Sequence, residues 1–430
     1  MALTGRAALA ALAGGFVVLV TASGAALLAV NAVLLAAIAA DLLLAAAIGK
    51  QEVARSGDAR IHLGQSGTIV VTVANAGRRR LRGTLRDGWR PSASAAPARA
   101  RIDLPAGASA TITTTLTPAR RGDITAGPVT IRSAGPLGLA ARQRSVAAPC
   151  TVRVLPPFLS RKHLPEKLAR LRELDGQHRS MLRGQGTEFD SLRSYVLGDD
   201  VRSIDWRSSA RQADVLVRTW RPERDRRIVI VLDTGRTSAG RVGGMPRLDA
   251  AMDAALLLAA LAVRAGDRVD LIAADRRVRA RVVGAQRNGV LAAITDELAL
   301  LEPDLVEPDV GLMIAAVLGF ARQRCLVVLL TDLNPAAIGE GLLPRAGLLA
   351  ARHQVLVAAV ADPKVDEMAA ARDDVTAVYG AAAAAAARAA RTHTAALLRR
   401  HGIEVVDASP DRLPPALADA YLALKAAGRL

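Results

Sequence analysis

Residues 1–50 form an almost unbroken apolar stretch, in which the only charged side chain between residues 7 and 49 is Asp41. Because about 20 apolar residues cross a bilayer, the stretch is long enough for two membrane helices. A short break of small and polar residues predicts these helices near 5–22 and 25–49. The pattern therefore predicts a transmembrane hairpin.

A cleaved signal peptide with Arg6 as its basic start is the alternative interpretation. The uncleaved hairpin is favoured because a second apolar run follows directly and because Lys50, Arg55 and Arg60 flank its end. Positive charge at both outer flanks and none in the turn predicts cytoplasmic termini. We therefore expect a multi-pass protein of the inner or plasma membrane with cytoplasmic soluble domains. Asp41 is either a functional acid in the membrane or a group that faces the neighbouring helix.

From residue 51 to 157 the pattern changes to short alternating runs separated by glycine, proline and asparagine. Runs at 68–77, 100–118 and 129–142 are typical of strands joined by tight turns. Several short strands at this spacing predict a β-sandwich of immunoglobulin-like type. No Cys–Trp–Cys pattern accompanies them, so the prediction concerns the architecture alone.

Residues 158–226 are polar and are predicted to be a mostly helical or irregular linker. Over residues 227–430, continuous apolar runs alternate with helical patterns, which is typical of a parallel sheet covered on both faces. The C-terminal part is therefore predicted to be a doubly wound α/β domain. Its expected strands cover 228–233, 267–275, 325–333, 355–362 and 403–409, and its expected helices include 247–264, 287–300 and 310–323.

The formal net charge of +17 raises the question of an anionic partner. Residues 51–157 carry 16 arginines against five acids, a net +11, so most of the charge lies in the predicted sandwich. Beside a membrane, an anionic leaflet attracts each basic residue by roughly 1 kcal/mol. Proteins that bind single-stranded nucleic acid also use aromatic platforms, and this segment offers only Trp89. Membrane lipid is therefore favoured over nucleic acid as its partner.

Few residues suggest catalysis. Cys150 and Cys325 lie far apart in strand-like apolar runs, where cysteine usually acts as a small buried hydrophobic residue. No CxxC or HExxH spacing occurs, so neither of these zinc motifs is present. The six histidines are scattered, and none lies in a serine-hydrolase elbow. The sequence therefore predicts a protein that is not an enzyme.

Two predicted strands end in aspartate, at Asp233 and Asp332, and ligands of a doubly wound sheet gather at the carboxyl ends of its strands. The run that follows Asp233 resembles the metal-ion-dependent adhesion site of von Willebrand factor type A domains, which begins Asp-x-Ser-x-Ser. The resemblance implies a Mg²⁺ site formed by Asp233, Thr237, Asp332 and, in the middle loop, Asp309. Gly235 stands in place of a serine, so we expect a degenerate site.

Residues 184–211, here called the signature segment, concentrate charge. Between 186 and 211 they hold five acids, four arginines and three of the chain's ten aromatic residues. One hypothesis makes Asp199, Asp200 and Asp205 the carboxylates of a metal-dependent hydrolase, which need raised or split pKa values. The nearby arginines instead favour ionised, paired carboxylates. We favour a structural role, in which apolar side chains anchor the segment on the α/β domain. These anchors are Phe189, Leu192, Tyr195, Ile204 and Trp206.

The signature segment resembles the hallmark of the domain-of-unknown-function 58 family. The matching residues are Gly186, Glu188, Phe189, Leu192, Arg193, Tyr195, Gly198, Asp199, Asp200, Arg202, Ile204, Asp205, Trp206, Ser209, Ala210 and Arg211. The expected membrane helices, sandwich and von Willebrand A-like domain agree with this resemblance.

The resemblance implies association with MoxR-type AAA+ ATPases, with transglutaminase-like membrane proteins and with other von Willebrand A proteins. It implies no established enzymatic activity. We therefore expect a membrane-anchored bacterial adaptor that docks a cytosolic MoxR-type ATPase in a chaperone-like assembly. The signature segment would join the sandwich to the α/β domain or form part of the partner surface. The alternatives are a carboxylate hydrolase and a lipid- or nucleic-acid-binding protein.

Overall fold

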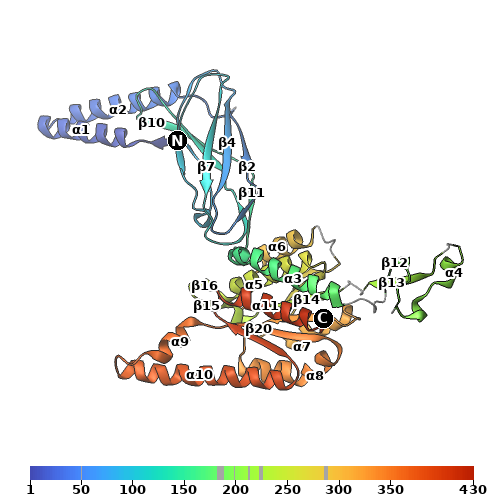
Figure 1. The fold of residues 1–430 in the computed structure, drawn as a ribbon. Coiled ribbons are helices and arrows are strands. Elements are labelled where there is room, and N and C mark those ends of the chain that lie inside the picture. The colour runs from blue at the N-terminus through green and yellow to red at the C-terminus, as the bar shows by residue number, and fades with distance from the viewer. Residues whose placement is uncertain (50, 182–187, 198, 212–213, 222–225, 285–288) are drawn as a thin grey trace. The chain divides into compact units, whose positions relative to one another are not determined.

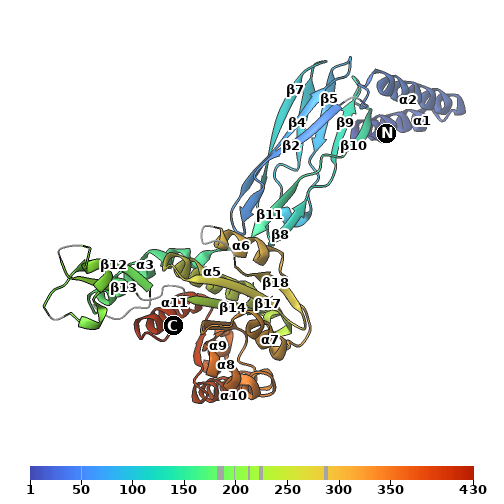
Figure 2. The ribbon, with the colours of Figure 1, turned by 90° about the vertical axis from the view of Figure 1, so that its right-hand side faces the viewer.

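The computed structural model describes residues 1–430 except 50, 182–187, 198, 212–213, 222–225 and 285–288. Predictions that involve Lys50, Gly186 and Gly198 therefore lie outside the described residues. Contacts divide the chain into two units, Met1–Leu155 and Pro156–Leu430, and each unit is described by itself (Figures 1 and 2).

The first unit contains a hairpin of two apolar helices, α1 (Gly5–Thr21) and α2 (Gly24–Leu44). The helices pack closely, because a Cβ on Gly14 would lie 2.5 Å from a methyl group of Val30. Among the described helices, α2 is the one long and apolar enough to cross a membrane, while α1 is apolar but has 17 residues. The prediction of two spanning helices is therefore not supported.

The second apolar helix ends at Leu44 rather than near residue 49. Ala45, Ala46 and Ile48 are buried, and Ala46 and Ile48 belong to a hydrophobic core with side chains of the sheets. Packing against the sheets therefore replaces the last predicted turn of the helix.

The strands of the first unit form a β-sandwich, as predicted. In β4 every second residue is buried, which is the period of a strand with one face in a core. Val71 and Val73 of β4 pack with Leu85 and Ile131 of a second sheet. The sheet orders are β1-β10-β9-β5-β6, β2-β4-β7 and β3-β11-β8. The strands are β1 (Ala2–Leu3), β2 (Gln51–Gly57), β3 (Arg60–His62), β4 (Gly67–Asn75), β5 (Leu81–Arg86), β6 (Arg99–Leu104), β7 (Ser109–Leu116), β8 (Gly122–Thr125), β9 (Val129–Ala134), β10 (Ala140–Val146) and β11 (Thr151–Leu155).

The second unit contains a six-stranded sheet of order β18-β17-β14-β19-β20-β21, in which β18 runs antiparallel and the other pairs are parallel. The predicted strands and helices are confirmed, and the edge strand β18 is an addition. The strands are β14 (Arg227–Asp233), β17 (Arg268–Ala274), β18 (Val278–Val282), β19 (Leu326–Leu330), β20 (Gln354–Val360) and β21 (Glu404–Ala408). A short hairpin is formed by β15 (Arg241–Val242) and β16 (Met245–Pro246).

Helices cover both faces of this sheet, as its apolar strands require. On β14, Ile228 and Ile230 pack on α5, α6 and α11, whereas Val229 and Val231 pack on α7, α8 and α10. The helices are α3 (Leu164–Met181), α5 (Arg247–Arg264), α6 (Val290–Leu300), α7 (Val310–Phe320), α8 (Leu343–Arg352), α9 (Pro363–Ala370), α10 (Val375–Arg400) and α11 (Leu413–Ala426).

The described residues of the signature segment form the first strand and the loop of a β-hairpin, here called the signature hairpin, rather than the predicted helical or irregular linker. Strands β12 (Glu188–Ser194) and β13 (Leu216–Arg221) pair antiparallel, and the short helix α4 (Trp206–Ser209) lies between them. A bulge between Phe189 and Ser191 breaks the two-residue alternation that identifies strands in a sequence. This break explains why the pattern did not predict β12.

Candidate functional site

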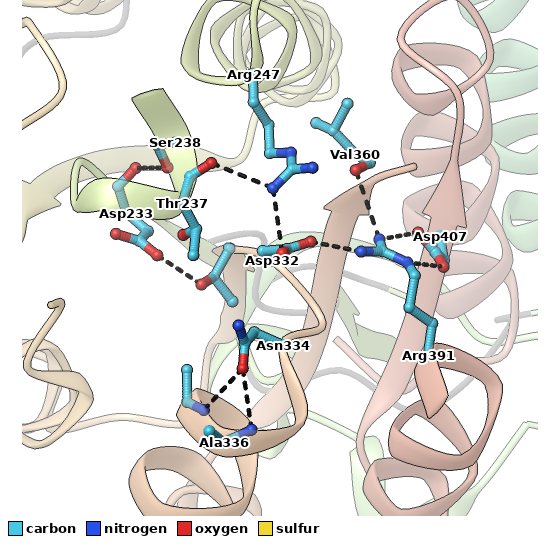
Figure 3. Close-up of polar contacts among 12 residues, drawn as sticks. Asp233, Thr237, Ser238, Arg247, Asp332, Asn334, Ala336, Val360, Arg391 and Asp407 are labelled. Carbon is cyan, nitrogen blue, oxygen red and sulfur yellow. Dashed lines mark hydrogen bonds and ion pairs between the residues drawn. The ribbon is translucent and has the colours of Figure 1, made fainter. Parts of the chain in front are cut away.

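Three strands of the parallel sheet are followed by aspartates at the same edge. Asp233 closes β14, Asp275 follows β17, and Asp332 lies just after β19. The strand order reverses between β14 and β19, and doubly wound domains bind their ligands at such a reversal. We call the surroundings of Asp233 and Asp332 the switch-point site (Figure 3).

Asp233 is almost completely buried in this site, with 1% of its surface exposed. One carboxylate oxygen accepts a hydrogen bond from the Gly235 N–H, and the other accepts one from the Thr331 hydroxyl, both at 2.7 Å. Burial raises the pKa of the Asp233 carboxyl; the two hydrogen bonds act against this change, and the charges of two neighbouring aspartates add to it. The predicted metal ligand is thus a buried acid held by an amide and a hydroxyl.

Asp332 is engaged by two arginines. Arg247 of α5 lies 3.1 Å from one carboxylate oxygen, and Arg391 of α10 lies 2.6 Å from the other. Arg391 also donates hydrogen bonds to both carboxylate oxygens of Asp407 in β21, at 2.7 and 3.2 Å. Figure 3 shows this row of alternating charges across the strand ends. Two guanidinium groups therefore compensate the carboxylate that was predicted to bind Mg²⁺.

The sequence analysis missed Arg247, Arg391 and Asp407. Burial opposes the charge of Arg391, but the hydrogen bonds and charges of its two carboxylate partners outweigh burial and raise the pKa of its guanidinium. The available signal was an arginine in an alanine-rich helix, because a charged side chain in an apolar setting usually has a partner. Its partner Asp332 lies 59 positions away, so the sequence could not identify it.

The other two predicted ligands stabilise the backbone. Asp309 caps α7, because its carboxylate accepts a hydrogen bond from an N–H of the first helical turn at 3.0 Å. The carbonyl oxygen of Thr237 accepts a hydrogen bond from Arg247. Among the residues that the structure describes, no group of three or more Asp, Glu, His or Cys side chains could hold a metal ion. The structure therefore does not gather Asp233, Asp309 and Asp332 into the predicted ligand set.

Gly235 replaces the expected serine for a steric reason. A Cβ at this position would lie 2.9 Å from both Pro308 Cδ and the carbonyl oxygen of Val306. The loop that carries these two residues is fixed to the same turn, because the Arg236 N–H donates to the Val306 carbonyl at 2.8 Å. Any side chain at Gly235 would therefore displace the loop.

The raised pKa of Asp233 predicts how stability depends on pH. A carboxyl whose pKa is raised by folding favours the folded state when protonated, and this contribution is lost as the pH rises through the folded pKa. We expect Asp233→Asn to gain stability relative to the parent between pH 4 and pH 7, because an amide can accept from Gly235, donate to Thr331 and carry no charge. Urea unfolding at several pH values measures the difference.

Asp309→Asn is the matched control, since it removes a carboxylate from the same edge while keeping a good helix cap. A difference between Asp233→Asn and the parent that does not change with pH would contradict a raised pKa at Asp233.

Two carboxylates of the signature hairpin accept hydrogen bonds from other groups of the same hairpin. Arg193 holds both oxygens of Asp199, at 2.6 and 2.8 Å. Asp205 accepts hydrogen bonds from the Ser208 N–H and from Arg218, at 3.0 and 2.8 Å. These bonds lower the pKa of Asp199, chiefly through Arg193, and that of Asp205, chiefly through the Ser208 amide. General acid catalysis needs the opposite change of pKa.

Asp200 and Tyr195 complete this frame. The Asp200 carboxylate accepts a hydrogen bond from the Arg202 N–H at 2.9 Å, and the Tyr195 N–H donates to the Val215 carbonyl at 2.8 Å. The backbones of Glu188 and Phe189 belong to β12. Arg202 and Arg211 are exposed.

The tip of the hairpin exposes apolar side chains. Leu197 is 96% exposed, Trp206 is 68% exposed, and Val196 and Val201 are exposed as well. Trp206 was predicted to be a buried anchor, and this prediction is wrong. Trp206 is the first residue of the short helix α4, directly after the capping Asp205. That the segment joins two parts of the chain stays a prediction.

The family model described as "Protein of unknown function DUF58" matches residues 191–404. "Uncharacterized protein Rv1480" of Mycobacterium tuberculosis and "Uncharacterized protein Mb1516" of Mycobacterium bovis are each 30% identical over 200 residues. These alignments cover 45% of this chain and 61% of each relative, so the chain spans less than two thirds of their length.

Two solved structures show weak likeness. The CARDB domain of the PF1109 protein from Pyrococcus furiosus is 14% identical and covers 24% of this chain and 92% of its own, with a TM-score of 0.19. A GH20 exo beta-N-acetylglucosaminidase from Vibrio harveyi is 12% identical and covers 83% of this chain and 75% of its own, with a TM-score of 0.22. At such TM-scores neither likeness bears on function. The family match includes most of the signature hairpin and nearly the whole six-stranded sheet, and the chain belongs to the DUF58 family.

Proposed function

We propose that this chain is a membrane-anchored adaptor without catalytic activity, which docks a cytosolic MoxR-type AAA+ ATPase through the tip of its signature hairpin. In this proposal α2 crosses the inner or plasma membrane with α1 packed along it, and the remaining domains are cytoplasmic. Other von Willebrand A and transglutaminase-like membrane proteins are further partners of the same assembly.

The observation that carries the proposal is the contrast between the frame and the tip of the hairpin. The carboxylates of Asp199 and Asp205 accept hydrogen bonds that fix the loop. Leu197 and Trp206, in contrast, face solvent. Exposed apolar residues on a fixed frame favour binding, because little conformational entropy is lost when a partner covers them. Tryptophan is also among the residues enriched at the energetic centres of protein interfaces.

The switch-point site supports docking by the hairpin rather than capture of a metal-bound partner. A six-stranded sheet with an antiparallel edge strand supports the proposal that this unit is von Willebrand A-like, and in that case its strand ends correspond to the adhesion site. Here, however, Arg247 and Arg391 already engage the carboxylate of Asp332. We propose that these internal cations replace Mg²⁺ in holding the strand ends together.

Affinity purification of the tagged full-length chain from native membranes, followed by mass spectrometry, tests the proposal. A double variant, Leu197→Ala with Trp206→Ala, should reduce recovery of the ATPase at least tenfold. Because both side chains are exposed, the double variant should change the free energy of unfolding by less than about 0.5 kcal/mol. The matched control is Val375→Ala with Tyr379→Ala, which removes two apolar side chains that are 73% and 75% exposed on α10.

Recovery of the ATPase with the parent and the control, but not with the hairpin variant, supports the proposal. Equal recovery with the hairpin variant and the control would show that the docking surface lies elsewhere. Absence of any ATPase would overturn the adaptor function. A parallel purification in EDTA tests Mg²⁺, and we expect no loss of partner. The hydrolase alternative is less well supported, because two of its three carboxylates have lowered pKa values.

A further inference from the structure

Both ends of the helical hairpin are fixed to one turn of the sandwich, residues 135–140. Asp41, near the end of α2, accepts hydrogen bonds from the backbone N–H groups of Leu137, Leu139 and Ala140, at 2.7–2.8 Å. Just before α1, the Thr4 hydroxyl donates to a carbonyl of the same turn at 2.5 Å. In Figures 1 and 2 the hairpin therefore projects from one end of the sandwich.

Arginines surround this junction. Arg142 donates to the carbonyl oxygen of Leu42 at 2.9 Å, and Arg79 donates to that of Leu43 at 2.5 Å. Arg144 donates to the carbonyl of Ile48, just beyond the helix, at 3.2 Å. These positions suit cations, because the last carbonyls of a helix carry partial negative charge. We call Arg79, Arg142 and Arg144 the basic collar.

The collar keeps hydrogen-bond donors for another ligand. A guanidinium has five N–H donors, and the described contacts use those of one nitrogen atom in each collar residue. Arg79 and Arg144 are also exposed to solvent. Arg6 adds a fourth guanidinium at the same turn, with Nη1 3.0 Å from the place that a Cβ on Gly138 would take.

The length of α2 predicts that the basic collar lies at the edge of the bilayer. Its 21 residues extend about 31 Å, close to the roughly 30 Å of a hydrocarbon core. When α2 spans that core, its last carbonyls lie at the boundary between hydrocarbon and headgroups. Met1, Leu3 and Leu137 are exposed beside the same junction. Apolar side chains next to arginines fit this boundary, where one side is lipid and the other is water.

We infer that the basic collar binds the phosphate groups of anionic phospholipids at the base of the hairpin. Arginine suits this ligand, since its planar donors can hold two oxygens of one phosphate. The net +11 of the sandwich region has the sign that an anionic leaflet requires. Because α2 is held to the sandwich by Asp41, lipid bound at the collar would also orient the sandwich against the membrane.

Native mass spectrometry of the full-length chain in neutral detergent tests this inference, with equal amounts of phosphatidylglycerol and phosphatidylcholine added. The parent should retain phosphatidylglycerol in preference to phosphatidylcholine. Each arginine at a membrane surface changes affinity roughly fivefold. In the triple variant Arg79→Gln, Arg142→Gln and Arg144→Gln, the preference for phosphatidylglycerol over phosphatidylcholine should therefore fall at least tenfold.

The matched control is Arg86→Gln, Arg99→Gln and Arg101→Gln. It removes the same charge from β5 and β6, toward the opposite edge of the sheet from β1 and β10. Loss of preference in the collar variant alone supports the inference. Equal loss in both variants would assign the effect to overall charge, and an unchanged collar variant would overturn the site. Glycerol 3-phosphate at millimolar concentration should not displace the lipid; displacement would assign the site to free phosphate.

The collar variant could also weaken the junction itself, so lipid-dependent stabilisation provides a second readout. Thermal unfolding of each variant is compared in phosphatidylglycerol and in phosphatidylcholine, with its own phosphatidylcholine value as the baseline. The inference would be contradicted by a collar variant that unfolds at a lower temperature than the parent but whose unfolding temperature rises from phosphatidylcholine to phosphatidylglycerol as much as that of the parent.

Discussion

Replacing Asp41 by alanine should destabilise the junction between the helical hairpin and the sandwich by about 3 kcal/mol or more. The carboxylate accepts three backbone hydrogen bonds and is fully buried. A buried N–H left without a partner costs about 1–3 kcal/mol, and hydrogen bonds to charged groups are at the upper end. Hydrogen exchange in detergent should become much faster at Leu137, Leu139 and Ala140.

Asn31→Ala is the control for this variant. Asn31 is a second polar side chain of α2, and its described bond goes to a carbonyl of its own helix. This change should leave exchange in residues 135–140 unaltered. Exchange that is equally slow in the parent and in Asp41→Ala would show that other contacts hold the junction. It would contradict the role assigned to Asp41 in stabilising this junction.

Replacing Arg391 by methionine should reduce the free energy of unfolding of the α/β unit by about 2–3 kcal/mol. Methionine keeps most of the apolar stem but leaves Asp407 and one oxygen of Asp332 without their cation. Removing one partner of a buried ion pair costs about 3–5 kcal/mol, and the partial exposure of this pair places the expected value below that range. Urea unfolding measures the change.

Two variants of α10 calibrate this result. Arg388→Met should change stability by less than about 0.5 kcal/mol, because Arg388 and its partner Asp366 are both largely exposed. Arg391→Lys keeps the charge but not the planar pair of donors, so it should fall between the parent and the methionine variant. A loss for Arg391→Met no larger than that for Arg388→Met would mean that the row of charges does not stabilise the strand ends.

The sequence by itself determined five of the six strands of the sheet and most of its helices. Runs such as residues 228–233 are apolar throughout, and only a strand covered on both faces buries every side chain of such a run. It also determined the sandwich, because residues 69, 71 and 73 of β4 are apolar and have the two-residue spacing of a strand with one buried face. These features depend on neighbouring residues, so a local pattern is sufficient to predict them.

Only the tertiary structure decided the roles of the charged residues. Asp332 was predicted to bind a metal, but it faces Arg391, 59 positions away, and Asp41 holds a turn 96–99 positions away. Trp206 was predicted to be buried but is exposed. A charge or an aromatic ring is stabilised by whatever the fold brings near it, and that neighbour can lie anywhere in the chain. Sequence pattern therefore predicted the strand that Asp332 follows, but long-range packing decided what these residues bind and whether they are buried.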